Sequence, residues 1–448
     1  MIQAIETKDS YVALCESAID ARRTAAEPAW LRSIRRGAAE RFRALGFPTT
    51  RDDEWRYTNV SRIADTPFEM ATHNDSSLAF ERIERFALTD VTACRLTFVN
   101  GRFDAGLSKL DGLPDGVTVC NLAAAMDTHA PLLESHLAQH ADCDGQAFVA
   151  LNTALFEDGA FVHVPKGVVV ETPIHVLFAT TPQSPAAMTS PRMLIVTEAN
   201  SRVTIVESYV GLDTGACFTN AVTEIVAGED SAMDHYKLER ENDEAYHIAT
   251  FQLDHQRGSN VSSHCISLGG ILVRNDINAL LDGEGCECTL NGLYLADGTQ
   301  HIDNHLRVDH AKPHCNSREF FKGVLAGKGR GIFSGKIMVR KDAQQTDAKQ
   351  SNKSLLLSPD ALVESKPQLE ILADDVKCTH GATIGQVNEE QMFYLRTRGL
   401  SEDAARTLLV YAFAREIIAG VRIPALRTLL DELVLAKLPQ GGSLDVSE

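Results

Sequence analysis

The segment DDVKCTHGATIG, residues 374–385, holds two side chains whose types and spacing suit metal chemistry. Cys378 and His380 are two residues apart, in a segment that we expect to be a strand. Residues i and i+2 of a strand project from the same face, about 6.6 Å apart along the strand. A thiolate and an imidazole placed in this way could reach one iron ion, one zinc ion or one cluster. Ordinary packing of the two side chains is the alternative.

Two ligands make only half of a typical four-ligand metal site. No other cysteine lies within 60 residues of Cys378. If Cys378 and His380 bind a metal, we therefore expect the missing ligands to come from another chain.

A second segment, HIDNHLRVDHAKPHC, collects further residues of metal-binding types. They are His301, His305, His310, His314 and Cys315. A helix would put His301 and His305 on one face, but Pro313 and the β-rich surroundings disfavour one long helix. On strands, these side chains either line a metal site or belong to a hydrogen-bonded polar strand with some surface histidines. The residues alone leave both interpretations open.

The glycine-rich segment GVLAGKGRGIFSGK, residues 323–336, contains two Gly-Lys pairs. A phosphate-binding P-loop needs a glycine five residues before such a pair, and Ser or Thr directly after the lysine. Lys322 and Arg330 occupy the positions of the required glycines, so we expect turn glycines here and no nucleotide bound by this chain. The H-E-x-x-H and G-x-S-x-G motifs of hydrolases are absent as well.

Helical patterns flank the chain at both ends. In residues 1–85, the apolar residues of AWLRSIRRGAAERFRALGFP recur at helical period. Residues 386–448 show helical patterns again, and we expect residues 439–448 to be a solvated tail. The capping and stop signals of the two regions are Gly46, Pro48, Asn388, Gly399, Ser401 and Pro424.

Short β-rich runs dominate residues 86–385, separated by turns that contain Gly, Asn or Asp. Four of these runs begin at Ser201, Ser231, Asn260 and Cys286, with spacings of 30, 29 and 26 residues. Such a drifting period is typical of the stacked coils of a β-solenoid. Because the hexapeptide signature of left-handed β-helices is missing, we predict a mainly β fold, a right-handed parallel β-helix with helical regions on either side. A β-sandwich is the alternative.

Composition excludes several classes of protein. Of the 448 residues, 44% are hydrophobic, and 61 acidic residues outnumber 43 basic ones, for a formal charge of −18. This balance disfavours binding to nucleic acids or to anionic membranes. No apolar run approaches the roughly 20 residues of a transmembrane helix. The N-terminal residues show no secretory signal, and the ten scattered cysteines read as reduced thiols, so we expect a cytoplasmic protein.

Long strings within residues 303–413 resemble the SufB/SufD family of the SUF machinery for iron–sulfur cluster assembly. The strings are VDHAKPHCNSREFFKGVLAGKGRGIFSGKI, VRKDAQQTDAKQSNKSLLLSPDA, KPQLEILADDVKCTHGATIG and MFYLRTRGLSEDAARTLLVYAF. RDDEWRYT near Trp55 resembles the family's N-terminal signature, so that the likeness covers most of residues 30–425. KCTHGAT fits SufD-type members better than SufB-type members, which carry a Glu-containing variant here with more cysteines nearby.

The resemblance implies a non-catalytic scaffold subunit that works with SufB and with SufC, an ABC-type ATPase. It places Cys378 and His380 at the SufB–SufD interface, as transient ligands of an iron–sulfur cluster shared with the partner subunit, and it implies that cluster formation needs His380. It also implies that helices within residues 388–425 dock SufC. The sequence does not decide between a heterodimer with SufB and a homodimer. Residues that would divide between core packing and partner contact are Phe393, Tyr394, Leu408, Leu409 and Phe413.

Two other functions stay open from the sequence. One is a SufB-like scaffold that accepts sulfur directly. The other is a β-helix enzyme that acts on polysaccharides. Such enzymes are usually secreted and use clustered acids or calcium, whereas the only suggestive acidic cluster here is Asp374–Asp375.

Overall fold

The computed structural model describes residues 2–22, 27–72, 80–88 and 94–438. The solvated tail expected at residues 439–448 lies outside the described residues.

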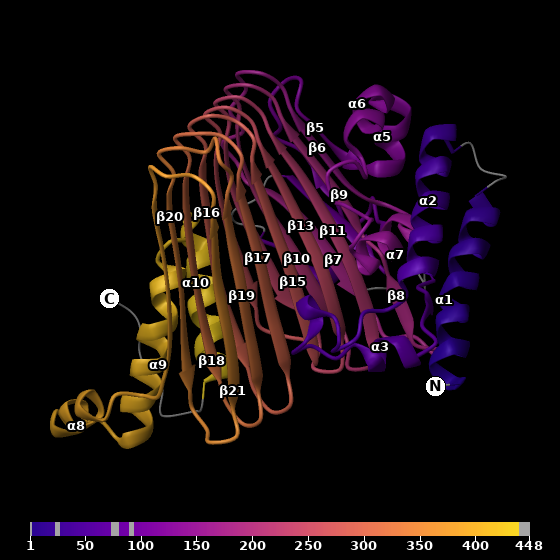
Figure 1. The fold of residues 1–448 in the computed structure, drawn as a ribbon. Coiled ribbons are helices and arrows are strands. Elements are labelled where there is room, and N and C mark those ends of the chain that lie inside the picture. The colour runs from indigo at the N-terminus through magenta and orange to yellow at the C-terminus, as the bar shows by residue number, and fades with distance from the viewer. Residues whose placement is uncertain (1, 23–26, 73–79, 89–93, 439–448) are drawn as a thin grey trace.

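Two sheets of eleven strands each form the body of the protein, and from β9 onward the chain alternates between them (Figure 1). The strands of sheet A are β1 (Glu69–Met70), β5 (Thr118–Asn121), β6 (Gly159–Val164), β8 (Ala187–Thr189), β9 (Arg192–Thr197), β11 (Cys217–Ala227), β13 (Tyr246–His255), β15 (Leu272–Leu281), β17 (His301–His310), β19 (Arg330–Val339) and β21 (Leu362–Ile371). The strands of sheet B are β2 (Cys94–Val99), β3 (Arg102–Phe103), β4 (Lys109–Leu110), β7 (Ile174–Thr180), β10 (Arg202–Gly211), β12 (Ala232–Arg240), β14 (Asn260–Ser267), β16 (Glu287–Ala296), β18 (Asn316–Leu325), β20 (Asp347–Leu356) and β22 (Lys377–Gly385).

Successive strands of sheet B from β10 onward are parallel and in strict register. One row of partners across this sheet is Arg202, Ala232, Asn260, Glu287, Asn316, Asp347 and Lys377. The row repeats every 27 to 31 residues, which is the period that the sequence indicated. The prediction of a parallel β-helix between helical regions is therefore confirmed, and the β-sandwich alternative is wrong.

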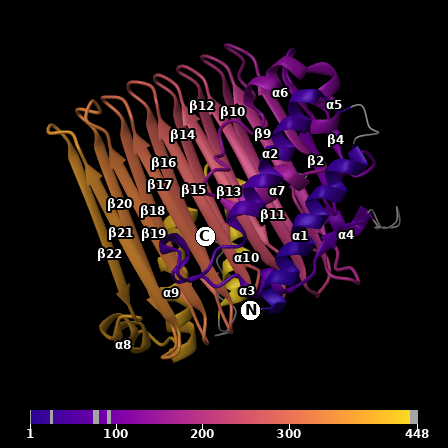
Figure 2. The ribbon, with the colours of Figure 1, turned by 45° about the vertical axis from the view of Figure 1, so that its right-hand side comes forward.

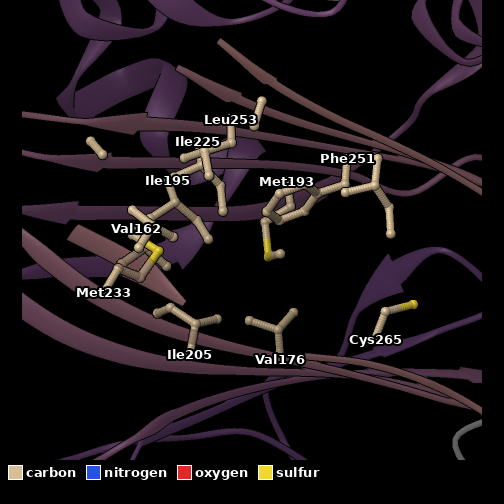
Figure 3. Packing of buried hydrophobic residues seen from close by; sticks show 14 of the residues in the cluster. Val162, Val176, Met193, Ile195, Ile205, Ile225, Met233, Phe251, Leu253 and Cys265 are labelled. Atoms are coloured by element: carbon tan, nitrogen blue, oxygen red, sulfur yellow. The ribbon is translucent and has the colours of Figure 1, made fainter. Parts of the chain in front are cut away.

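Apolar side chains from both sheets fill the interior of the solenoid (Figure 3). Val162 and Ile195 of sheet A, for example, approach Ile205 and Val176 of sheet B, and all four are fully buried. Burial of each such side chain contributes about 1.5–3 kcal/mol. Because side chains alternate between the two faces of a strand, the same period of two that fills the interior leaves every second residue on the outer faces, where the helices pack.

Helices cover the outer faces of both sheets (Figures 1 and 2). Near the start of the chain, α7 packs against β11 of sheet A, and α1 and α2 pack on α7. Near its end, α9 packs against β16 and β18 of sheet B. The helices are α1 (Ile2–Ala21), α2 (Ala29–Leu45), the 3-10 turn η2 (Asp53–Trp55), α3 (Ser61–Asp65), α4 (Phe80–Glu84), α5 (Leu122–Thr128), α6 (Ala130–His136), α7 (Ala147–Leu155), α8 (Glu389–Thr397), α9 (Glu402–Ile418) and α10 (Pro424–Lys437).

The capping signals in the sequence mark the ends of the helices correctly. Gly46 ends α2 with φ of 66°. The Asn388 side chain accepts a hydrogen bond from the backbone N–H of Gln391 at the start of α8. Ser401 caps α9 by accepting from Ala404. The sequence did not indicate α5, α6 and α7, which have only seven to nine residues each. Within the described residues, no helix is long and apolar enough to cross a membrane.

Arg274 on β15 fastens the N-terminal segment to the outer face of sheet A. Its guanidinium lies 3.7 Å from the centre of the Trp55 ring and donates a hydrogen bond to the Glu54 carbonyl at 2.7 Å. The same group pairs at 2.9 Å with the buried Asp303 carboxylate, which also accepts from the Thr58 hydroxyl at 2.5 Å. Trp55 and Thr58 belong to the RDDEWRYT segment, so this part of the family signature holds the N-terminal region on the solenoid.

We predict that Arg274→Met lowers the free energy of unfolding by about 3–5 kcal/mol, because it leaves the buried Asp303 carboxylate without its guanidinium partner. Chemical denaturation of both proteins measures the difference. The matched control is Arg257→Met, which removes an arginine whose ion pairs with Glu229 and Asp230 are more than half exposed. Equal effects of the two substitutions would contradict the prediction.

Candidate functional site

The last coil of the solenoid has an open edge. β22 pairs with β20, and β21 pairs with β19; both stand at the end of their sheets in the described part of the chain. Figure 2 shows this end beside α8, in orange and yellow. An end strand presents a row of backbone N–H and C=O groups without strand partners. Both sheets therefore end on a surface that another strand can extend.

Cys378 and His380 lie on β22, as the sequence predicted, and face the interior side of the last coil. Cys378 is the register partner of the buried Ala348, and His380 is the partner of Gln350. The Cys378 side chain is half-buried against the apolar residues that close the interior, whereas His380 is exposed. Burial raises the pKa of the Cys378 thiol, and the charge of Asp347 adds to this effect. Metal binding must therefore remove a proton from this thiol.

The described residues supply no further ligands at this place. Nowhere among them do three or more His, Cys, Asp or Glu side chains gather so that they could hold a metal ion. Cys378 and His380 thus form at most half of a metal site within this chain.

Two polar residues stand behind His380 inside the solenoid. Glu319, Gln350 and His380 occupy one column on β18, β20 and β22. The Gln350 amide donates a hydrogen bond to the Glu319 carboxyl at 2.5 Å. It lies against Gly335 of the opposite sheet, where any Cβ would collide with it. Burial raises the pKa of Glu319 to about 8, so that a neutral carboxyl group is stored behind the site at neutral pH.

Our reading of the sequence missed Glu319 and Gln350. The signal was the repeat itself, because these residues precede His380 by one and two coil periods.

The structure disperses the histidine-rich segment instead of gathering it into one site. His301 contacts the Thr58 hydroxyl at 2.9 Å on the outer face of sheet A, and His305 contacts Asp303 at 3.1 Å. His310 faces inward and bonds to Ser317, whereas His314 lies at an exposed turn and Cys315 is buried beneath it. The arrangement fits a hydrogen-bonded polar strand.

His305 belongs to the contact between the N-terminal segment and sheet A. Its burial alone would lower its pKa, but the Asp303 carboxylate outweighs this effect and raises the pKa of His305 to about 9. Its second ring nitrogen lies 3.3 Å from the Glu54 carboxylate. The charged imidazole therefore holds two carboxylates together at neutral pH.

The glycine-rich segment has a packing role. Gly323 and Gly331 lie in β18 and β19, where a Cβ would collide with the Tyr294 ring. Gly327 lies in the turn between these strands with φ of 58°. The expectation of turn glycines thus holds for Gly327, while the two strand glycines make room for an interior aromatic ring.

A hollow separates the last coils from the C-terminal helices. It has a volume of about 510 Å³. Its lining includes Leu357 and Pro359 after β20, Val387 after β22, and Phe393 of α8. Phe393 is 72% exposed and its neighbour Tyr394 is 56% exposed. These two aromatic side chains project from α8 without burial in the core.

The other three residues in question are more buried than Phe393 and Tyr394. Leu408, Leu409 and Phe413 of α9 are half-buried. The Phe413 ring centre lies 4.1 Å from the Lys322 ammonium of β18. Phe413 therefore takes part in packing α9 on sheet B.

Two family models together match most of the chain. The model for the "SUF system FeS cluster assembly, SufBD core domain" matches residues 178–413, and the model for the "SufBD protein N-terminal region" matches residues 5–176. The chain belongs to the SufBD family. This membership confirms the resemblance seen in the sequence and assigns the chain to the SUF system of iron–sulfur cluster assembly.

Curated SufBD relatives match over nearly their full length. The chain is 35% identical over 411 residues to an iron–sulfur cluster assembly SufBD family protein of Synechocystis, with 89% of each chain covered. It is 29% identical to the iron–sulfur cluster assembly protein SufD of Escherichia coli, over 88% of this chain and 90% of that protein. It is 26% identical to SufD of Bacillus subtilis, over 92% and 95%.

We predict that Glu319 makes the stability of this SufBD protein depend on pH. Its pKa is about 8 in the folded state against an ordinary value of 4.5, so the folded state holds the proton more tightly. The stabilisation is therefore complete below pH 4.5 and is lost as the pH rises through 8, by up to about 1.4 kcal/mol per pH unit. Denaturation midpoints at pH 5, 6.5 and 8 measure it.

Glu319→Gln keeps the side chain neutral, so its stability should fall less over this range than that of the parent protein. Glu364→Gln on β21 removes an exposed carboxylate and serves as the control. A parent-like fall in the Glu319→Gln variant would show that another group causes the pH dependence.

Proposed function

We propose that this chain is the SufD-type scaffold subunit of a SUF assembly complex. In this proposal it supplies Cys378 and His380 to a nascent iron–sulfur cluster that is shared with a second SufBD-family chain. The observation that carries the proposal is the coincidence of two features at one place: half of a ligand set and an unpaired solenoid end. The similarity to the SufD proteins of E. coli and B. subtilis supports the SufD assignment.

The last coil has the properties of a surface for strand addition. Leu362, Ile371, Leu372 and Ile384 are apolar and exposed there, although such residues normally lie in the core. A second solenoid end would cover them and would satisfy the backbone groups of β21 and β22. A SufB-type chain is the partner we propose, and a second copy of this chain is the alternative that the same surface would allow.

The iron–sulfur cluster is the cargo of this site. Cys378 would bind iron as a thiolate, and because burial raises its thiol pKa, iron binding should strengthen as the pH rises. His380 would bind through a neutral imidazole nitrogen. Since His380 is exposed and Cys378 only half-buried, a cluster held here could leave for a recipient protein.

We further propose that the C-terminal helical region, residues 386–448, docks the SufC-type ATPase. Residues 1–85 would form the N-terminal helical region and residues 86–385 the β-helix core. Exposed aromatic side chains beside a hollow are typical anchors of protein interfaces, and Phe393 and Tyr394 have this arrangement. The ATPase would supply the energy of nucleotide hydrolysis, and this chain would act as a non-catalytic scaffold.

The cytoplasm is the compartment that we propose for this complex. All ten cysteines are free, which agrees with a reducing environment.

The first test of the proposed function is His380→Ala in an anaerobic reconstitution with candidate SufB-type and SufC-type chains. We expect the variant to keep both partners in co-purification but to lose most of the cluster absorbance, iron and sulfide of the parent complex. His314→Ala, which removes an exposed histidine from a turn, is the matched control. Parent-level cluster content in the His380→Ala complex would refute the assignment of His380.

A second test concerns the docking of the ATPase. We expect the double substitution Phe393→Ala and Tyr394→Ala to weaken binding of the SufC-type ATPase at least tenfold, because hot-spot aromatic residues typically contribute about 2 kcal/mol or more. Binding of the SufB-type chain should not change. The control is Tyr57→Ala, which removes an exposed aromatic ring from the N-terminal region. Titration calorimetry measures both interactions, and unchanged ATPase affinity would rule out α8 as the anchor.

A further inference from the structure

Two cysteines that the proposed function does not use stand next to each other at one corner of the solenoid. Cys286 directly precedes β16 and Cys315 directly precedes β18. Their following residues, Glu287 and Asn316, are register partners, so the two cysteines occupy equivalent positions on successive coils. The Asn316 N–H donates to the Cys286 carbonyl at 2.8 Å. Both cysteines are free and fully buried.

The two sulfur atoms point to the same place. The Cys286 thiol and the Cys315 thiol each lie 3.1 Å from one acceptor, the Gly283 carbonyl oxygen. The Cys315 thiol also hydrogen-bonds to the Cys286 sulfur. Neighbouring parallel strands lie about 4.8 Å apart, and disulfides form between residues whose α-carbons are about 4.4–6.8 Å apart. The backbone at this corner therefore already has the spacing that a disulfide requires.

The surroundings make one of these thiols reactive. The Cys315 thiol and, at 3.8 Å, the Ser259 hydroxyl donate to the Cys286 sulfur. These hydrogen bonds lower the pKa of Cys286 to about 7, so that a thiolate is present at neutral pH beside a protonated thiol. Cys288, only two residues further, differs sharply, because burial raises its pKa. A thiolate is the form of cysteine that reacts with peroxides.

The corner also lies close to solvent. Glu284 and Gly285 precede Cys286 in an exposed turn, and the exposed His314 precedes Cys315. Turns at the surface open at a small fraction of the free energy of global unfolding, so a small oxidant can reach a thiol directly beneath them.

We propose that Cys286 and Cys315 form a peroxide-sensitive dithiol site that closes to a disulfide between two coils of the solenoid. In the first step, the Cys286 thiolate attacks hydrogen peroxide, the O–O bond breaks, and hydroxide leaves and takes up a proton to become water. The product is a sulfenic acid on Cys286. In the second step, the Cys315 sulfur attacks the Cys286 sulfur, the S–O bond breaks, and a second water leaves with the thiol proton. Two thiols and one peroxide thus yield one disulfide and two waters.

The test uses the full-length protein alone, without any SUF partner, so its outcome is independent of the proposed scaffold function. Reduced protein is exposed in its folded state to hydrogen peroxide, quenched with an alkylating reagent, digested and analysed by mass spectrometry. We expect a linked peptide pair that contains Cys286 and Cys315, that disappears with dithiothreitol, and that forms several-fold faster at pH 8 than at pH 6. The melting temperature should rise on oxidation.

Matched variants separate this site from the other cysteines. Cys286→Ser and Cys315→Ser should each abolish the linked peptide and the rise in melting temperature, whereas Cys288→Ser should keep both. The proposal is overturned if the unsubstituted protein retains both thiols in alkylated form after peroxide treatment. It is equally overturned if its disulfide joins other cysteines. Because the first measurement needs no substitution, a variant that fails to fold cannot hide either result.

Discussion

Backbone hydrogen bonding between successive coils is the interaction on which this structure depends. Each inner coil is bonded to the coil before it and to the coil after it, whereas β21 and β22 have such partners on one side only. The free side cannot be removed without ending the solenoid in some other way, because any parallel stack has a last coil. This chain places Cys378, His380 and several exposed apolar residues at that end. The incomplete ladder and the incomplete ligand set therefore occur on the same strand.

The strict register of the coils turns distant residues into neighbours. Positions that differ by one coil period face the same way, so Glu319 and Gln350 stack behind His380 in the interior. The same rule places Cys286 directly beside Cys315 at a corner. The interior thus carries polar chemistry in columns along the solenoid axis, between rows of apolar side chains. A substitution in one coil will be felt mainly by the coils directly above and below it.

Local patterns in the sequence were sufficient for the coil period, for the helix caps at Asn388 and Ser401, and for the common face of Cys378 and His380, because each depends on residues close together in the chain. The contact of Thr58 with Asp303 spans 245 residues, and no local pattern indicates it. Glu319 and Gln350 were missed because their role requires an exact alignment of coils whose lengths vary from 27 to 31 residues. The short helices α5–α7 offer too few turns for a helical period to show.

The central claim is that the open end of the solenoid is completed by a second SufBD-family chain. Hydrogen exchange with mass spectrometry, on the full chain alone and with a saturating SufB-type partner, tests it most directly. The account predicts that the amides of β21 and β22 exchange more slowly when the partner is bound, while those of α8 respond only to the SufC-type ATPase. If a bound SufB-type partner leaves exchange at β21 and β22 unchanged, the two chains meet elsewhere and Cys378 and His380 do not share a cluster across that edge.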